Sequence, residues 1–220
     1  MSRPRPQPTT DLTPATWLSE EIPDFGHQAG NLVPSRYEHL ALVPHPGGED
    51  EEGRPPPVLL ATLCDVLAPH TGTPERCWFG LWDGWAWIDG GAGVMITSGG
   101  RAGSSYSTPS AFPREILDGP RVQLPSRDYL LLGGPLESAL EIGYRSGELF
   151  ARHHPELHLD PERWDPQPPS IFWPDDRAWF VASEIDLPYT YVAGSAELIA
   201  DVLAAPGLEA VPARREDPLP

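Results

Sequence analysis

The apolar residues of this chain fall in short runs, and the densest run lies between residues 76 and 88, where four tryptophans occur within ten positions. An Asp83-Gly84 dipeptide divides this run, and Asp-Gly between apolar segments favours a two-residue hairpin turn. In that register Trp82 would lie opposite Trp85, and Gly80 would leave room for the ring of Trp87. Because side chains of a strand alternate between its faces, one face would carry Trp78, Trp82, Trp85 and Trp87, and the other Cys77, Phe79, Leu81, Ala86 and Ile88. The pattern predicts a Trp-rich hairpin that is central to the fold or lines a deep site.

Further apolar runs predict strands at residues 36–43, 127–132 and 177–187, with 189–192 continuing or pairing with the last of these. A spacing of three to four residues predicts helices at 13–21 and 58–67, and at 196–203 after Gly194-Ser195 as the cap. Segments rich in glycine or proline are expected to be loops or crossing segments. They comprise residues 44–57, 90–103 and 161–174, and 90–103 is interpreted as a linker rather than as a loop over a ligand.

Residues 135–152 show the clearest helical periodicity in the chain. Leu136, Ala139, Leu140 and the residues at helical spacing after them are apolar or small, whereas acidic residues and arginines occupy the other side. Gly143 and Gly147 are four residues apart on the apolar face, where they would let an aromatic ring approach closely. The pattern predicts an amphipathic helix that ends before Pro155.

These elements together predict an α+β fold in which an antiparallel-leaning sheet, with the Trp-rich hairpin at its centre, is packed by several helices. The Pro- and Thr-rich residues 1–11 are expected to form a disordered tail, and residues 212–220 a polar tail. Residues 12–211 would form a single domain, as the chain length suggests.

The chain carries 15 basic and 32 acidic residues, which gives a formal net charge of −17. Such a charge opposes binding to nucleic acids and to anionic membranes, and it favours a basic protein as partner. All the basic residues are arginines, so the chemistry of a Walker-A lysine, a kinase lysine or a Schiff base is excluded. We expect no cofactor.

Cys64 and Cys77, the only cysteines, lie in apolar runs and are expected to behave as small buried hydrophobes. The first residues show no signal-peptide pattern, and no stretch of 18 apolar residues is present. A cytoplasmic location is therefore the expectation.

Glu184 and Asp186 are the strongest candidates for chemistry. Two residues apart on a strand, they would point to the same face and could hold a cation or act as acid and base. The alternative is a solvated strand end or an ion pair with an arginine, and Asp175-Asp176-Arg177 is interpreted as a structural capping turn.

The other motifs give weaker indications of a functional site. His153, His154 and His158 are interpreted as a surface helix end rather than a metal site, because Pro155 interrupts them and no glutamate takes the position of a zincin base. Ser104, Ser105 and Ser107 lie in no nucleophile motif. The tryptophan face would either pack against the 135–152 helix as core or stack a ligand.

Three motifs resemble a family of uncharacterised actinobacterial proteins. They are TPERCWFGLWDG at 73–84, RDYLLLGGPL at 127–136 and WPDDRAWFVASEID at 173–186. The resemblance covers roughly residues 34–211 and implies a single-domain cytoplasmic bacterial protein, without indicating an activity or catalytic residues.

Charge and the lack of a catalytic signature predict an acidic cytoplasmic protein-binding module, immunity-like or regulatory, without catalytic activity. The alternative is a small-molecule-binding protein or hydrolase. Its pocket would be lined by Trp82, Trp85 and Trp87, with Glu184 and Asp186 as its polar groups. Neither hypothesis requires a metal, and the oligomeric state is left open.

Overall fold

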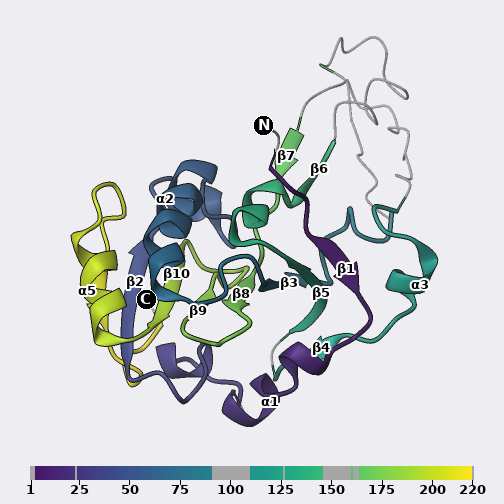
Figure 1. The fold of residues 1–220 in the computed structure, drawn as a ribbon. Coiled ribbons are helices and arrows are strands. Elements are labelled where there is room, and N and C mark those ends of the chain that lie inside the picture. The colour runs from purple at the N-terminus through teal and green to yellow at the C-terminus, as the bar shows by residue number, and fades with distance from the viewer. Residues whose placement is uncertain are drawn as a thin grey trace, which may run out of the picture.

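The computed structural model describes residues 3–22, 24–90, 110–125, 127–145, 160 and 164–219. A nine-stranded sheet forms its centre, with every described pairing antiparallel (Figure 1). Its strands are β1 (Gln7–Thr9), β2 (His39–Pro44), β3 (Cys77–Trp82), β4 (Val122–Gln123), β5 (Asp128–Gly134), β8 (Ile171–Pro174), β9 (Phe180–Ala182), β10 (Tyr189–Gly194) and β11 (Val211–Ala213). They follow the order β1-β5-β3-β8-β9-β10-β2-β11, and β4 also pairs with β5. β6 (Gly143–Arg145) and β7 (Trp164–Pro166) form a separate two-stranded ribbon.

The helices are α1 (Leu18–Glu21), α2 (Pro57–Leu67), α3 (Arg114–Leu117) and α5 (Ala196–Ala204). Helices α2 and α5 pack on one face of the sheet and share a buried cluster with it. The other face is covered by α1 and the irregular chain around it, and the residues of that cluster include Trp17, Leu18, Trp173, Phe180 and Tyr191. The predicted α+β class is confirmed. Among the described residues, no helix has the length and apolar character needed to cross a bilayer.

The predictions for helices 58–67 and 196–203 are confirmed by α2 and α5. In α5 the hydroxyl of Ser195 accepts a hydrogen bond from the amide of Leu198 at 3.1 Å, which caps the first turn as predicted. The segment 13–21 is instead split into a 3₁₀ turn, Thr13–Ala15, and the short α1.

The predicted Trp-rich hairpin is wrong. β3 pairs with β5 and β8 rather than with residues 85–88, which form turns. Within β3 the predicted alternation holds, because Cys77, Phe79 and Leu81 join one core cluster while Trp78 and Trp82 pack against the other. Trp85 and Trp87 belong with the first cluster, so the four tryptophans are divided between the two faces of the sheet.

Close packing explains two glycines of this region. A Cβ on Gly80 would lie 2.5 Å from Cγ1 of Ile171, so this glycine admits Ile171 and not the ring of Trp87. At Gly84 a Cβ would lie 2.1 Å from the Trp82 ring, which folds back over the turn. Gly84 is therefore needed for space, and it is not among the residues with positive φ that a type I′ turn requires.

The predicted helix 135–152 is also wrong over its described part. Residues Leu136–Glu141 form a 3₁₀ helix, and the chain then extends into β6. Gly143 has a φ of 155° and lies opposite Pro166 of β7, where a Cβ would meet the Asp165 carbonyl oxygen at 2.5 Å. Close strand pairing at Gly143 thus replaces helix packing, and residues 146–159 lie outside the described part of the chain.

Both predicted tails contain ordered structure. Residues 7–9 form β1, which pairs with β5, and residues 211–213 form β11, which pairs with β2. Residues 214–219, here called the strap, run along the segment 27–34. Backbone amides of Ala29 and Gly30 donate to carbonyls of the strap at 3.0 and 2.9 Å, and the Leu219 amide donates to the His27 carbonyl at 2.9 Å. The guanidinium of Arg215 donates to the carbonyls of Gly30, Val33, Pro34 and Tyr37.

Candidate functional site

Glu184 and Asp186 do not lie on a strand, because β9 ends at Ala182 and the chain turns before β10. Their carboxylates nevertheless converge on one group. Nη2 of Arg127, just before β5, donates to Glu184 Oε1 at 2.7 Å and to Asp186 Oδ2 at 2.6 Å. The expected common strand face is thus wrong, and the ion pair with an arginine is what the structure contains.

These three charged groups differ in exposure. The side chain of Glu184 is 12% exposed and that of Asp186 is 72% exposed, with Arg127 between them at 24%. Because one guanidinium faces two carboxylates, the group carries one negative charge in excess. Glu184 lies at the buried end and Asp186 at the solvent end.

One of the candidate tryptophans contacts this group. The guanidinium carbon of Arg127 lies 5.8 Å from the centroid of the Trp82 ring, within the range of a cation–π interaction. Trp85 meets Trp82 edge-on at 5.2 Å, whereas Trp87 stacks on Tyr144 at 5.3 Å in the other core cluster. The structure therefore brings Trp82, Glu184 and Asp186 together around Arg127 and places Trp87 elsewhere.

Both carboxylates line a cleft of about 200 Å³ between the segment 25–32 and the turn after β9. Its walls also include Phe25, Leu32, Leu187 and, from the strap, Leu219. Phe25 is 64% exposed at the rim and meets the ring of His27 edge-on at 5.5 Å. None of the three candidate tryptophans lines this cleft.

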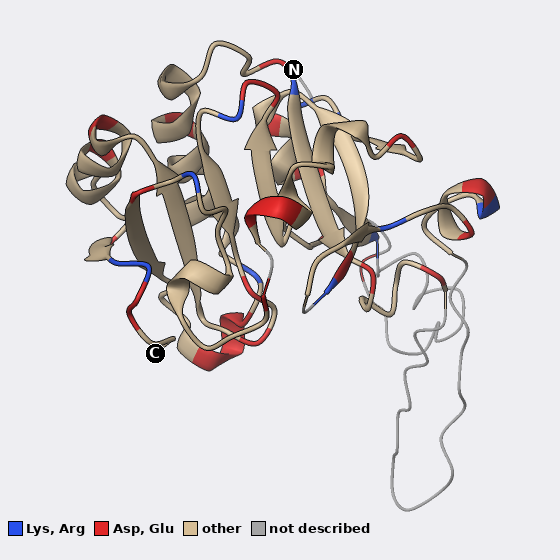
Figure 2. Ribbon diagram, turned by 90° about the horizontal axis from the view of Figure 1, so that it is seen from below, with Lys and Arg blue, Asp and Glu red and all other residues tan. Residues whose placement is uncertain are grey.

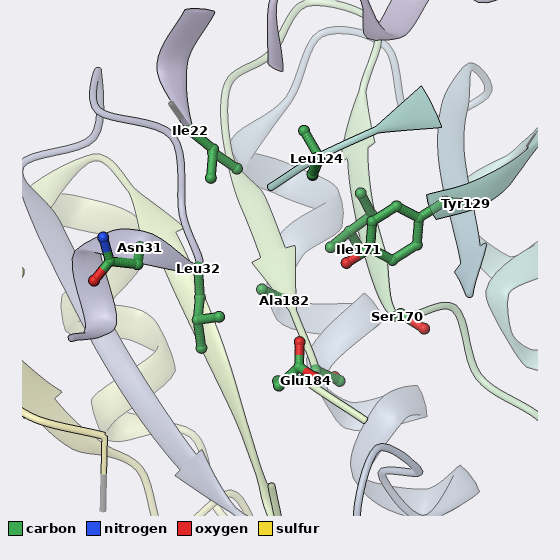
Figure 3. Close-up of a pocket in the computed structure, with 10 residues that line it drawn as sticks. Ile22, Asn31, Leu32, Leu124, Tyr129, Ser170, Ile171, Ala182 and Glu184 are labelled. Carbon is green, nitrogen blue, oxygen red and sulfur yellow. The ribbon is translucent and has the colours of Figure 1, made fainter. Parts of the chain in front are cut away.

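A second, smaller cavity of about 20 Å³ adjoins the cleft and shares Asn31, Leu32 and Glu184 with it. Figure 3 shows Leu32 on one side of this cavity, Tyr129 and Ile171 on the other, and Glu184 at one end. Burial raises the pKa of Tyr129 well above its usual value, so its phenol stays protonated. The small cavity has the size of one water molecule.

A buried chain of hydrogen bonds supports the turn that carries Glu184. His45 Nδ1 lies 2.7 Å from the backbone carbonyl of Glu51, which can only accept, so this nitrogen carries the proton. Burial lowers the pKa of His45 and keeps the ring neutral. Nε2 therefore accepts from the Thr190 hydroxyl at 2.9 Å, and the Ser183 hydroxyl donates to Thr190 at 2.7 Å.

The sequence did not predict this chain of hydrogen bonds, because isolated serine, threonine and histidine residues in apolar segments form no recognisable motif. All three side chains are at most 4% exposed. The chain joins the acidic segment 49–52, through the Glu51 carbonyl, to Ser183, the residue before Glu184. It therefore fixes two acidic segments relative to one another.

The acidic run Glu49-Asp50-Glu51-Glu52 lies beside the turn that carries Asp186. The amide of Gly53 donates to the carbonyl of Leu187 at 3.1 Å. Gly53 has a φ of 62°, and a Cβ there would lie 2.5 Å from Cα of Ile185, so only glycine permits this approach without strain. Close backbone contact thus joins the acidic run to the rim of the cleft.

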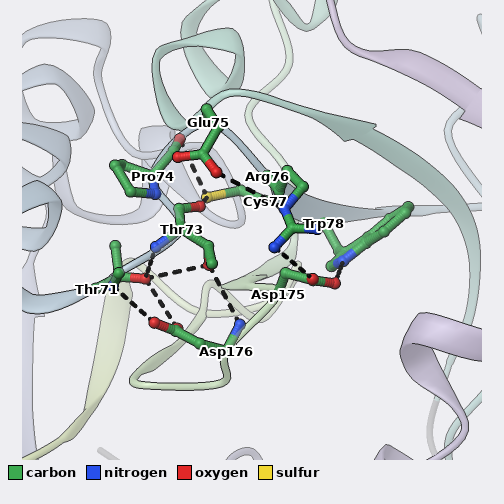
Figure 4. Close-up of polar contacts among 10 residues, drawn as sticks. Thr71, Thr73, Pro74, Glu75, Arg76, Cys77, Trp78, Asp175 and Asp176 are labelled. Atoms are coloured by element: carbon green, nitrogen blue, oxygen red, sulfur yellow. Dashed lines mark hydrogen bonds and ion pairs between the residues drawn. The ribbon is translucent and has the colours of Figure 1, made fainter.

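Asp175 and Asp176 have the structural role that the sequence predicts. The carboxylate of Asp176 accepts hydrogen bonds from the Thr71 hydroxyl at 2.8 Å and the Gly72 amide at 2.7 Å (Figure 4). Asp175 accepts from the indole nitrogen of Trp78 at 3.0 Å and pairs with Arg76 at 3.4 Å. These contacts join two of the quoted motifs and hold the loop before β3 against the turn between β8 and β9.

The remaining candidates offer no described site. The three serines and the three histidines of the sequence analysis lie outside the described residues, as do residues 91–103 of the predicted linker. Cys64 and Cys77 are buried, as predicted, and burial raises the pKa of each thiol to about 12, which suppresses the nucleophilic thiolate. Within the described ranges, no three histidine, cysteine or acidic side chains are grouped to hold a metal ion.

The cleft thus offers carboxylate acceptors around the Arg127 guanidinium, an aromatic rim and apolar walls. This combination suits the binding of a group that carries positive charge and hydrogen-bond donors. Among known proteins, no family model, no curated protein and no solved structure matches this chain.

Proposed function

We propose that this protein is a non-catalytic, cytoplasmic binding module whose partner is a basic protein. The observation that carries the proposal is the joining of two acidic segments, the run 49–52 and the turn with Glu184 and Asp186, at the rim of one cleft. Oppositely charged surfaces attract over a distance of about a Debye length and thereby accelerate association.

Four of the arginines are already used in contacts within the chain. Arg127 is shared by two carboxylates, Arg36 pairs with Glu21 at 2.7 Å, and Arg121 pairs with Asp83 at 3.0 Å. The guanidinium of Arg215 donates hydrogen bonds to backbone carbonyls. Acidic residues, red in Figure 2, are spread over the ribbon and outnumber the basic residues in blue.

The small-molecule alternative has weaker support. Glu184 and Asp186 line the cleft, but the tryptophans that were expected to line it lie elsewhere. One arginine already engages both carboxylates. We therefore place this hypothesis second.

The proposal is tested by capture of the tagged protein from its native host at low salt, followed by mass spectrometry of bound proteins and small molecules. We expect a stoichiometric basic protein that dissociates at high salt. A retained small molecule without a protein partner would contradict the proposal and favour the alternative.

A matched pair of variants makes this test specific. Glu49→Gln, Asp50→Asn and Glu52→Gln together remove three negative charges, whereas Glu49→Asp, Asp50→Glu and Glu52→Asp keep them. We expect only the first set to slow association, by roughly tenfold at low salt. Equal association rates would argue against binding through this surface.

A further inference from the structure

We propose that the cleft lined by Glu184, Asp186 and Leu219 receives one arginine or lysine side chain of the basic partner. The inference rests on the proposed function and specifies how that partner is recognised.

The carboxylates favour a cation that carries N–H donors. Arg127 engages one oxygen of each carboxylate, Glu184 Oε1 and Asp186 Oδ2, while each carboxylate can accept several hydrogen bonds. With one guanidinium for two carboxylates, the group retains one negative charge. One additional cation would balance that charge, and its donors would use the other carboxylate oxygens.

Arg127 also prepares the site before any partner arrives. Because it binds both carboxylates at 2.7 and 2.6 Å, it holds them close together despite their mutual repulsion. A site that is already organised avoids the cost of ordering its side chains upon binding.

The walls suit the aliphatic stem of the same side chain. Leu32, Leu187 and Leu219 are apolar, and Phe25 at the rim is 64% exposed. Arginine and lysine bury their methylene groups against apolar surface while the charged head seeks polar partners. The volume of about 200 Å³ exceeds the 150 Å³ or so of a cavity that holds benzene, so one side chain is accommodated.

The test uses N-acetyl-arginine-N-methylamide as probe and the neutral citrulline analogue, which has nearly the same shape, as control. Backbone amide shifts of Asn31 and Leu187 are followed by NMR during each titration of the full chain. We expect the arginine probe to shift both signals saturably and the citrulline probe to bind at least tenfold more weakly, because charged hydrogen bonds are the stronger ones.

Two variants separate charge from shape. Asp186→Asn removes a largely exposed carboxylate and leaves the pair of Glu184 with Arg127 intact, so we expect folding to persist and probe affinity to fall about tenfold. Leu219→Trp keeps the charges but fills the cleft and should abolish probe binding. Asp65→Asn, an exposed position on α2 at the opposite face of the sheet, is the control for a lost charge.

Equal binding of the two probes, no binding of either, or unchanged affinity in Asp186→Asn would overturn the inference. The proposed function is judged separately, by the capture of a basic protein from the host. A salt-sensitive basic partner without probe binding would refute the cleft as its recognition site while leaving the function standing. Probe binding without any basic partner would refute the function.

Discussion

Replacing Thr190 by valine tests the hydrogen-bond chain beneath the cleft. Thr190 is fully buried, and valine has nearly the same shape, so the substitution removes the hydroxyl and creates almost no cavity. Two hydrogen bonds are lost, one to His45 Nε2 and one from Ser183.

The two losses are not equal. Ser183 borders the small cavity and can rotate its hydroxyl toward it, whereas His45 Nε2 becomes a buried acceptor without a donor. Leaving one buried polar group unsatisfied costs about 1–3 kcal/mol, and the second lost bond adds about 1 kcal/mol. We therefore expect Thr190→Val to lower the free energy of unfolding by about 2–4 kcal/mol.

Urea unfolding followed by tryptophan fluorescence measures this change, since the chain has eight tryptophans. Thr190→Ser is the control, because it keeps the hydroxyl and loses one methyl group, at a cost of about 1 kcal/mol. Ser183→Ala should cost less in the Thr190→Val background than in the wild type. A valine variant as stable as wild type, or less affected than the serine variant, would refute the deduced chain of donors.

Two further predictions concern stability. Because the folded-state pKa of His45 lies below its unfolded value of 6.5, the unfolded chain takes up a proton first as the pH falls, so stability should decrease below about pH 7. The free energy of unfolding should decrease by at most about 1.4 kcal/mol per pH unit, and by less in His45→Asn. Urea titrations at pH 7 and 5 measure both changes, and an equal decrease in the wild type and in His45→Asn would contradict the prediction. Gly80→Ala should cost about 1–3 kcal/mol, because its Cβ would lie 2.5 Å from Ile171 Cγ1. The cost should shrink in an Ile171→Ala background in denaturation experiments, and an unchanged cost would mean that another contact is responsible.

Local patterns predicted the parts of the fold that local interactions determine. Helices α2 and α5 follow from apolar periodicity and, at Ser195, from a capping hydroxyl. The alternation of β3 also follows from sequence, because it depends only on strand geometry. The strands that pair with β3 do not follow from the local sequence. The Trp82 ring fills the space at the turn at Gly84, and β3 pairs with the distant strands β5 and β8 instead.

The candidate site shows the same division. The spacing of Glu184 and Asp186 identified them as a pair, but Arg127, which joins them, lies 57 residues before Glu184 and carries no local signal. The periodicity of 135–152 suggested a helix because the pairing of Gly143 with β7 cannot be read from that segment alone. Both the missed arginine and the wrong helix thus result from contacts between segments that are distant in the sequence.

The strap gives the cleft an unusual place in the folding process. Arg215 binds the carbonyl of Gly30 across 185 residues of sequence, and Leu219 from the same strap forms one wall. Closing so long a loop is entropically costly and is compensated only when the intervening sheet already exists. A complete cleft is then a property of the finished native state, and a partner that inserts a side chain there would discriminate mature molecules from incompletely folded ones.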